Sequence, residues 1–198
     1  MKLVGSPTSP YVRKIRIQCL ERNITIEFVP DNPFESETLR TQNPLGRVPV
    51  LISDDGCIYD SPVIMEYLDT CHDGPAIFPK DAWDIRIQHA LCDGILDSSI
   101  NLMMERRRDA MRSAPLIPDW WVERQYQAID AGLRVLQDQQ DLLENPSLHA
   151  GQIGAICTLG YLNFRFADLR LDEKYPHLAI WGKKFEQRAS VQSTQPPA

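Results

Sequence analysis

The sequence predicts a small domain of mixed strands and helices followed by an all-helical domain, and three observations carry this prediction. Strand-like and helix-like stretches alternate through the first third of the chain, in the order β-α-β-α-β-β-α. The segment HDGPAIFPKD, with two prolines and a glycine, then breaks that pattern. Beyond it, apolar residues recur at three- and four-residue steps. We therefore expect a first domain over residues 1–73, a linker over 74–83 and a helical domain over 84–198.

Each element of the first domain has its own local signal. KLVG is a short apolar strand, and the stretch from Pro10 carries apolar residues at helical spacing. TIEFV alternates β-branched and aromatic residues, which is typical of a strand. DDG lies between two short apolar runs and is typical of a hairpin turn. The expected elements are a strand over 2–5, a helix over 10–22, a strand over 25–29, a helix over 35–41, strands over 47–53 and 57–59, and a helix over 61–71.

The second domain shows helical patterns and no internal repeat. Apolar residues keep helical spacing over 87–102, 122–143 and 155–166. Trp120 and Trp121 open the second of these helices. The end of the chain, SVQSTQPPA, is polar and contains two prolines, so we expect it to be a loosely held tail.

Charge and hydropathy exclude several classes of protein. The 198 residues include 21 basic and 27 acidic side chains, for a net charge of -6, whereas a general nucleic-acid binder needs a basic surface. The basic clusters Arg13-Lys14-Arg16 and Arg106-Arg107-Arg108 are interpreted as solvated helix faces. No apolar run is long enough to span a membrane, and the N-terminus lacks the pattern of a secretory signal. We expect a cytoplasmic protein with neither a nucleic-acid nor a membrane partner.

The five cysteines predict neither a disulfide framework nor a metal site. None of them forms a C-x-x-C pair, and none stands at metal-ligand spacing to the four histidines. Cys19 and Cys157 fall on apolar faces of predicted helices, where a reduced cysteine behaves as a small apolar side chain.

Three Ser-Pro or Val-Pro pairs are candidates for a binding site. Ser9-Pro10 and Ser61-Pro62 each suit a helix start, with serine as N-cap and proline in the first helical position. Such a helix start can also bind an anion, and Asp60 beside Ser61 could hold an ammonium group. The alternative is that these residues only cap surface helices.

Pro49 lies inside the strand-like run RVPVLI, although proline cannot donate a hydrogen bond to a sheet. Only about 5–6% of X-Pro bonds are cis in folded proteins, so base rates alone favour a trans Val48-Pro49 bond. A cis bond would direct the N–H and C=O of Val48 outward, toward a peptide-like ligand.

The order and spacing of SPYVRKIRI (9–17), NPLGRVPVL (43–51) and DSPVIMEYL (60–68) resemble the cytosolic glutathione S-transferases, in particular their bacterial members. The stretch ICTLGYLNFR (156–165) is similar to the core helix of that family's second domain. The match covers nearly the whole chain. The resemblance implies an α+β thioredoxin-like first domain, an all-helical second domain, usually a homodimer, and glutathione as co-substrate without a metal.

The resemblance also implies roles for individual residues. The backbone of Val48 would pair with the cysteinyl part of glutathione, with Pro49 cis. Asp60 and Ser61 would hold the γ-glutamyl end, and Arg47 would approach the glycyl carboxylate. Ser9 matches the position at which related classes carry a catalytic serine or cysteine. SPYV looks like a CPYC-type redox motif without its cysteines, and that loss disfavours thiol–disulfide exchange through a protein mixed disulfide.

The implied reaction needs the thiolate of glutathione, and a serine hydroxyl can stabilise it. Lowering a thiol pKa by about two units takes roughly 2.7 kcal/mol. A hydrogen bond to a charged acceptor contributes roughly 1.5–3 kcal/mol, and a helix N-terminus roughly 0.3–1 kcal/mol. Ser9 is the leading candidate for this donor, and Ser6 and Thr8 are its rivals.

The electrophile would lie between the domains. We expect Tyr11, Met103 and Arg107 to line its site, although methionines at helical spacing are more often part of a core. The reaction could be conjugation of a small hydrophobic electrophile, or glutathione-dependent peroxidase or reductase chemistry. A non-catalytic glutathione-binding regulatory protein of the same fold is the alternative from another class.

One helix start departs from the pattern of the family. Many members begin the core helix of the second domain with a Ser/Thr-x-x-Asp capping box, and His149 and Gln152 stand at those positions here. Histidine is not among the residue types that usually cap a helix N-terminus, and losing a cap costs about 0.5–2 kcal/mol. We therefore expect His149→Thr to raise the melting temperature.

Overall fold

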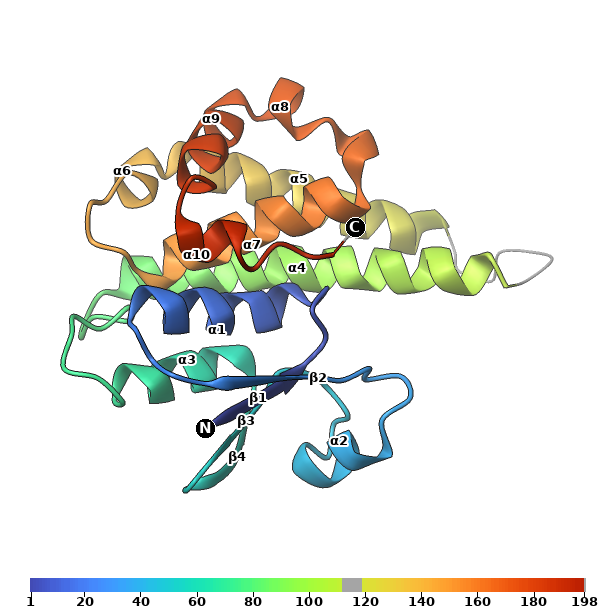
Figure 1. Cartoon of the computed structure of the whole chain (residues 1–198). Helices are drawn as coiled ribbons and strands as arrows, with labels where there is room; N and C mark the ends of the chain where they lie inside the picture. Colours follow the sequence, from blue (N-terminus) through green and yellow to red (C-terminus); the bar gives the residue numbers. More distant parts are fainter. Residues whose placement is uncertain (112–118, 198) are drawn as a thin grey trace.

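The computed structural model describes residues 1–111 and 119–197, and Figure 1 shows the whole chain. An α+β half of thioredoxin-like order precedes an all-helical half, as predicted. The first half contains β1 (Lys2–Gly5), α1 (Pro10–Glu21), β2 (Glu27–Pro30), α2 (Glu37–Gln42), β3 (Val50–Ser53), β4 (Gly56–Tyr59) and α3 (Ser61–Asp69). The second contains α4 (Trp83–Asp109), α5 (Asp119–Asp138), α6 (Gln140–Leu143), α7 (Ala150–Arg165), the 3-10 turn η1 (Ala167–Leu169), α8 (Leu171–Lys174), α9 (Pro176–Phe185) and α10 (Ala189–Gln192).

The four strands form one mixed sheet in the order β2-β1-β3-β4. β1 pairs in parallel with β2, while β1 with β3 and β3 with β4 are antiparallel. The DDG turn closes the β3–β4 hairpin as expected, and Gly56 adopts a φ of +105° there, which glycine tolerates without steric cost. Each strand has four residues, so the longer strand expected over 47–53 starts only after Pro49.

Helices α1 and α3 lie between the sheet and α4, as Figure 1 shows. α1 packs very close to the end of β1, because a Cβ on Gly5 would meet a methyl group of Val12 at 2.4 Å. Glycine is therefore required at the point where the strand leaves the sheet. This close packing fixes where the first turn of α1 stands.

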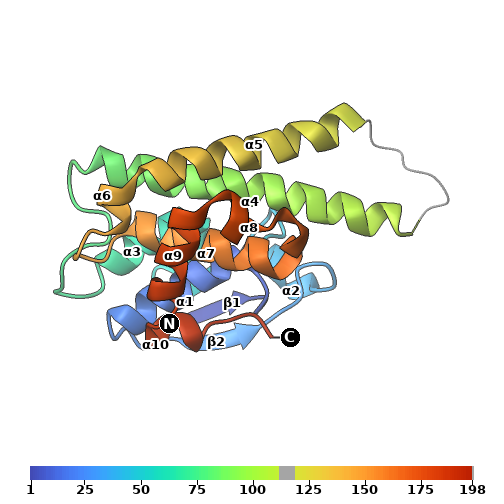
Figure 2. The same cartoon turned by 90° about the horizontal axis from the view of Figure 1, so that it is seen from above.

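The helical half is built on the long helix α4, which packs against α5 and α7 (Figure 2). α7 is the most buried helix of this half, in keeping with the apolar stretch at 153–162. One apolar cluster runs from Leu3 and Val12 in the first half to Leu159 and Trp181 in the second. The two halves therefore share a continuous hydrophobic core, which holds α1 against the helical half.

The segment between the halves is packed against both of them. The N–H groups of Ile77 and Phe78 donate to the Asp69 carboxylate, each at 3.0 Å, and the Ala150 N–H donates to the Ile77 carbonyl at 2.9 Å. The side chains of Ile77 and Phe78 are both buried. We propose domain bounds of 1–73 and 84–198, with the linker over 74–83.

The expectation of a loose C-terminal tail is wrong for the residues that the structure describes; Ala198 lies outside them. Val191 and Thr194 are buried, and Arg13 of α1 donates to the Val191 carbonyl at 3.1 Å. Arg188 and Ser190 both bind the Glu21 carboxylate. Polar composition suggested mobility, but the long-range bonds to α1 hold the end of the chain in place.

The interpretation of Arg13-Lys14-Arg16 as a solvated face is also wrong. Arg13 is 6% exposed and Lys14 is fully buried. The reason is that α1 lies between the sheet and the helical half, so that it packs against α7 and α10, and Lys14 forms an ion pair with Asp93 of α4. By contrast, Arg106, Arg107 and Arg108 at the end of α4 are exposed, as expected.

Candidate functional site

The strand register brings three predicted features to one edge of the sheet. Val4 pairs with Val50, and Val50 pairs with Tyr59. The chain therefore leaves β1 toward Ser9, enters β3 from Pro49 and leaves β4 toward Asp60, all at the same edge. Residues that lie 11 to 51 positions apart in the sequence come to the same end of the sheet through this pairing.

Ser9 is the N-cap of α1. Its hydroxyl oxygen accepts a hydrogen bond from the Val12 N–H at 3.4 Å, and Pro10 occupies the first helical position. The hydroxyl proton makes no hydrogen bond to any described residue, so it remains available to a ligand. The half-buried side chain combines this donor with the amides of a helix start.

The two rival hydroxyls are turned toward each other. Ser6 Oγ and Thr8 Oγ1 form a hydrogen bond of 3.0 Å, and the Thr8 N–H also approaches Ser6 Oγ at 3.4 Å. Because this pair is engaged within its own loop, the geometry favours Ser9 over Ser6 and Thr8 as the donor to a ligand.

The Val48-Pro49 peptide bond is cis. The base rate favoured trans, and the family resemblance implied cis. Hydrogen bonds among the described residues leave the N–H and C=O of Val48 without a protein partner. The neighbouring Arg47 is exposed, and its carbonyl accepts from Asn43 Nδ2 at 2.8 Å. A free backbone donor and acceptor thus lie beside a solvent-exposed guanidinium.

Asp60 and Ser61 form the start of α3 in a way that differs from the expectation. Asp60, rather than Ser61, is the N-cap, and its carboxylate accepts from the Ser61 N–H at 2.8 Å. Asp60 adopts a φ of +65°, a conformation that non-glycine residues seldom take and that recurs at functional sites. The expectation was wrong because a Ser-Pro pair does not reveal which of two adjacent polar residues makes the cap.

Ser61 consequently points its hydroxyl elsewhere. The side chain is 1% exposed, and its Oγ has no hydrogen-bond partner among the described residues. A buried hydroxyl without a partner is rare and costs about 1–3 kcal/mol. Together, the amides of the α3 start, the Asp60 carboxylate and this hydroxyl can bind both charged ends of an amino-acid group.

Tyr11, expected to border the electrophile, binds Asp97 of α4 through its hydroxyl. Burial raises the pKa of Tyr11, and the hydrogen bond to Asp97 and the charge of that carboxylate raise it further. The phenol is therefore neutral at physiological pH, and its proton is held by Asp97. Tyr11 can form a wall of the site, but it does not compete with Ser9 as the donor to sulfur.

The sequence patterns did not predict a buried polar cluster that lies next to Tyr11. Lys14 Nζ forms an ion pair of 2.5 Å with Asp93 and lies 3.2 Å from His89 Nε2. Burial and the charge of Lys14 hold the pKa of His89 far below its usual range, so the ring is neutral. Asp93 and Asp97, four residues apart on α4, were the available signal, since that spacing places both on one helix face.

Met103 and Arg107 lie on the C-terminal part of α4. Tyr11 pairs with Asp97 and Lys14 with Asp93, so α1 and α4 run in opposite directions. Ser9, at the start of α1, therefore faces the part of α4 beyond Asp97, where half-buried Met103 stands. One turn farther, the Arg107 guanidinium lies 5.9 Å from the ring centre of Phe34.

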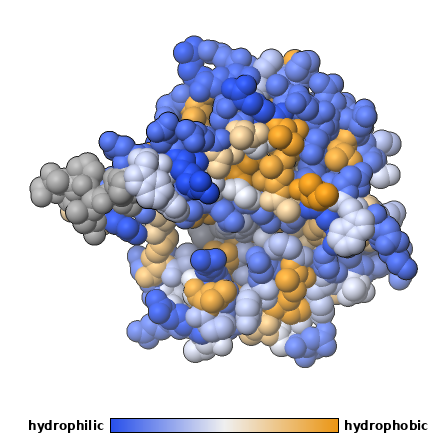
Figure 3. All heavy atoms as spheres, turned by 180° about the vertical axis from the view of Figure 1, so that it is seen from behind, coloured by the Kyte–Doolittle hydropathy of each residue, from blue (hydrophilic) through white to orange (hydrophobic). Residues whose placement is uncertain are grey.

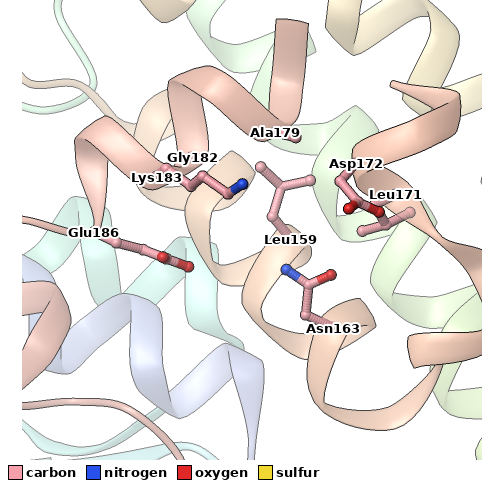
Figure 4. A pocket seen from close by; sticks show the side chains of 8 residues that line it. All are labelled: Leu159, Asn163, Leu171, Asp172, Ala179, Gly182, Lys183 and Glu186. Atoms are coloured by element: carbon pink, nitrogen blue, oxygen red, sulfur yellow. The ribbon is translucent and has the colours of Figure 1, made fainter. Parts of the chain in front are cut away.

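The molecular surface is hollowed between the two halves on the face shown in Figure 3. A separate pocket of about 290 Å³ lies between α7, α8 and α9 (Figure 4). Its walls include Leu159, Asn163 and Lys183, and none of the predicted site residues lines it. We place the candidate site at the sheet edge rather than in this pocket, because the unpartnered donors and the helix starts gather at the sheet edge.

The described parts of the chain contain no group of three or more His, Cys, Asp or Glu side chains arranged to hold a metal ion. All five cysteines are free thiols, and Cys19, Cys92 and Cys157 are buried. Among the helices of residues 1–111 and 119–197, none has the length and apolar character needed to cross a membrane.

Two family models match the chain. Residues 3–76 match the family model of the glutathione S-transferase N-terminal domain, and residues 120–181 match that of the C-terminal domain. The uncharacterized GST-like protein YibF of Escherichia coli K12 is 36% identical over 100% of this chain and 99% of its own length.

Two solved structures cover almost the whole chain. A glutathione transferase family member from Pseudomonas fluorescens Pf-5, with bound glutathione, has a TM-score of 0.92 at 33% identity and covers 100% of this chain and 99% of its own. A glutathione S-transferase from Methylobacillus flagellatus KT, also with glutathione bound, has a TM-score of 0.89 at 35% identity, with 99% of each chain covered. With matches to both domain models and full-length similarity to these proteins, the chain belongs to the glutathione S-transferase family.

Proposed function

We propose that this protein is a glutathione transferase that activates the glutathione thiolate for attack on a small hydrophobic electrophile. The observation that carries the proposal is the gathering of three incomplete hydrogen-bonding elements at one sheet edge: the Ser9 hydroxyl, the Val48 backbone and the Ser61 hydroxyl. Each has bonding capacity that no described residue uses. The relatives from Pseudomonas fluorescens and Methylobacillus flagellatus, solved with glutathione, support glutathione as the occupant.

In this proposal, glutathione lies along the edge as an extended peptide. The N–H and C=O of Val48 pair with its cysteinyl unit, as one strand pairs with another. The α3 start and Ser61 bind the γ-glutamyl carboxylate, Asp60 binds the ammonium group, and Arg47 approaches the glycyl carboxylate. The sulfur then stands at the start of α1, beside Ser9.

The chemical step proposed for Ser9 is stabilisation of negative charge on sulfur. Its oxygen accepts from the Val12 N–H, which leaves its proton free to donate to the thiolate. One hydrogen bond to a charged acceptor contributes about 1.5–3 kcal/mol, enough to lower a thiol pKa by roughly one to two units. The thiol proton passes to water, and Tyr11 and Met103 form walls for the electrophile.

Positions 9 and 12 hold Ser9 and Val12 rather than cysteines, which supports conjugation over thiol–disulfide exchange. A disulfide reductase that works through a protein mixed disulfide needs a thiolate at this helix start. A glutathione-binding protein without turnover remains the alternative, and the Ser9 hydroxyl is the feature that separates the two.

The test compares Ser9→Ala with Ser6→Ala as a matched control. With a chlorodinitrobenzene as electrophile, we expect Ser9→Ala to lower kcat/KM about 10- to 100-fold, since it removes one hydrogen bond to the thiolate. Binding to immobilised glutathione should change far less, and Ser6→Ala should behave like the unmodified chain. Retention without any turnover in the unmodified chain would identify a binding protein. Equal loss of turnover and binding in Ser9→Ala would move the catalytic role to another residue.

We also propose a homodimer in the cytoplasm. Val63 of α3 and Trp83 and Ile87 of α4 are between 54% and 67% exposed, and large apolar side chains of this kind mark protein interfaces when they gather in one patch. Five free cysteines suit a reducing compartment.

A further inference from the structure

The loop between α2 and β3 carries two of the residues expected to bind glutathione, Arg47 and Val48. Three of its side chains, those of Pro44, Leu45 and Arg47, are exposed, so they contribute little packing to the loop. Loops without such packing are more mobile than the elements that they connect. A backbone that binds a ligand from this loop therefore needs another source of rigidity.

Asn43, directly after α2, is a buried polar side chain that bonds to two other parts of this loop. It is 2% exposed. Its Oδ1 accepts from the Leu45 N–H at 3.0 Å, and its Nδ2 donates to the Arg47 carbonyl at 2.8 Å. Its backbone N–H donates to the Leu39 carbonyl, and its carbonyl accepts from the Gly46 N–H, each at 2.8 Å. Asn43 thus closes the turn and ties it to α2.

The carboxamide of Asn43 has the chemistry that this turn requires. The two side-chain bonds need an acceptor and a donor on the same short side chain, and a carboxamide places them on two separate atoms. An ionised aspartate has acceptors only, and serine has a single oxygen, which cannot stand at both places. Gly46 completes the turn with a φ of +61°, which glycine adopts without steric cost.

The hydrogen bond from Asn43 also sets the direction of the Val48 N–H. The Arg47 carbonyl and the Val48 N–H belong to one planar peptide group in the trans form, in which the two point in opposite directions. Because the carbonyl is held toward Asn43, the N–H points away from it. Within residues 1–111 and 119–197, no group accepts from this N–H. The bond to the carbonyl also polarises the peptide group and makes its N–H a stronger donor.

The side chain of Val48 holds the same peptide against the sheet. It packs on a small apolar cluster of Val4, Leu39 and Val50, and the last two of these are fully buried. Val4 and Val50 are paired across β1 and β3. The peptide before Val48 is therefore fixed by a hydrogen bond and by packing, while its N–H stays open to a ligand.

We propose that Asn43 is a positioning residue for glutathione, because it holds the Arg47–Val48 peptide with the Val48 N–H directed at the cysteinyl carbonyl of the bound tripeptide. This inference rests on the proposed function, which supplies glutathione as the occupant. Asn43 itself is buried and acts through Val48. The alternative is that Asn43 only stabilises the end of α2, with no effect on the ligand.

The experiment compares Asn43→Asp and Asn43→Ser with the unmodified chain. Both variants keep an oxygen for the Leu45 N–H and lose the donor to the Arg47 carbonyl. Calorimetric titration uses S-methylglutathione, which has no thiol to ionise. We expect its Kd to rise about ten-fold in both variants, the ratio that the loss of one hydrogen bond gives. Asn43→Ser adds no charge, so the same rise in both variants excludes an effect of charge on Arg47.

Turnover separates positioning from a general loss of structure. With a chlorodinitrobenzene as electrophile, the KM for glutathione should rise about ten-fold in both variants, whereas kcat at saturating glutathione should fall much less. A purely structural role predicts the reverse, because a smaller folded fraction lowers kcat while the molecules that remain folded keep their KM.

Asn145→Asp is the matched control. Asn145 Oδ1 accepts from the Ser147 N–H at 2.9 Å in a similar turn of the helical half, so the substitution makes the same chemical change in another loop. It should leave the Kd for S-methylglutathione and the KM for glutathione unchanged. Circular dichroism checks the fold of each variant, and Asn43→Ser decides the question if Asn43→Asp does not fold.

The outcomes distinguish this inference from the proposed function. An unchanged Kd for S-methylglutathione in the folded Asn43 variants, or a lower kcat with an unchanged KM, overturns the positioning role and leaves glutathione conjugation intact. Failure of the unmodified chain to bind both glutathione and S-methylglutathione overturns the proposed function and this inference together.

Discussion

At the scale of single residues, two serines at helix starts differ in what their hydroxyls do. Ser9 accepts from the Val12 N–H and so stabilises α1 as an N-cap. The Ser61 hydroxyl is buried without a partner, while Asp60 takes over the capping of α3. The Ser9 hydroxyl stabilises the fold and retains a proton for a ligand, whereas the buried Ser61 hydroxyl, without a partner, lowers the stability of the free chain. A substitution at Ser61 can therefore separate an effect on ligand binding from an effect on the free energy of unfolding.

We predict that Ser61→Ala leaves the free energy of unfolding unchanged or raises it, by up to about 1–2 kcal/mol. The substitution removes a buried polar atom that has no protein partner, and alanine suits a helix better than serine does. Urea unfolding without glutathione measures this. A loss of more than about 1 kcal/mol would show that the hydroxyl has a stabilising partner in the folded chain.

At the scale of elements, the start of α7 corrects the expectation drawn from His149. His149 Nδ1 accepts from the Gln152 N–H at 3.3 Å, and Gln152 Oε1 accepts from the His149 N–H at 3.2 Å, so a capping box is present. His149 Nε2 also donates to the Leu142 carbonyl at 2.9 Å. The residue type predicted a poor cap, but the imidazole ring accepts the capping hydrogen bond as a serine or threonine hydroxyl would. It also adds a hydrogen bond to α6.

We now predict that His149→Thr lowers the melting temperature, the reverse of the expectation from sequence. Threonine can restore the bond to the Gln152 N–H, but it is too short to reach the Leu142 carbonyl, and losing that partner costs about 1 kcal/mol or more. Thermal unfolding at neutral pH measures this, with His149→Ala as a more severe control. A higher melting temperature for the threonine variant would show that the histidine cap is weaker than its geometry indicates.

Sequence patterns predict elements well where the signal is local, and poorly where it is not. The order of strands and helices, the hairpin at Gly56 and the Ser9 cap all depend on residues within a few positions of each other. The burial of Lys14 depends on Asp93, 79 positions away, so a pattern confined to α1 could not reveal it. The same holds for Arg13, whose partners Val191 and Thr194 lie in and just after α10, near the end of the chain.

The candidate site could be proposed from sequence only because its parts have recognisable short motifs. Ser9, Val48-Pro49 and Asp60-Ser61 belong to such motifs, and the strand register then brings them together. Asp97 belongs to a stretch interpreted only as a helix. Its hydrogen bond with Tyr11 follows from the packing of α4 against α1, which spacing along the chain does not encode.

At the scale of the whole molecule, the contact between the two halves includes a buried ionisable cluster. His89 of α4 faces Lys14 of α1 at 3.2 Å and Asp93 of its own helix at 3.8 Å, and the edge of the Phe78 ring packs against it. The Lys14 ammonium donates to Nε2, so the neutral form of His89 is the one that fits. Protonating this ring would put two positive charges side by side at the interface.

We predict that stability falls as pH decreases below about 6.5. Burial and Lys14 hold the pKa of folded His89 far below its unfolded value, so the unfolded chain binds more protons in this range and gains stability relative to the folded chain. The slope is about 1.4 kcal/mol per pH unit for one histidine. Burial lowers the pKa of His149 too, so His89→Gln should reduce the slope without abolishing it. Urea unfolding between pH 7 and pH 5 measures both slopes, and identical slopes would contradict the buried neutral His89.

The most direct test of the central claim is calorimetric titration of glutathione into the unmodified chain and into Ser61→Ala. The account predicts saturable binding of one glutathione per chain, and an affinity about ten-fold lower in Ser61→Ala, because a buried hydroxyl that now has no partner would donate to the γ-glutamyl carboxylate. The absence of binding by the unmodified chain at millimolar glutathione would contradict the account, as would an unchanged affinity in the variant.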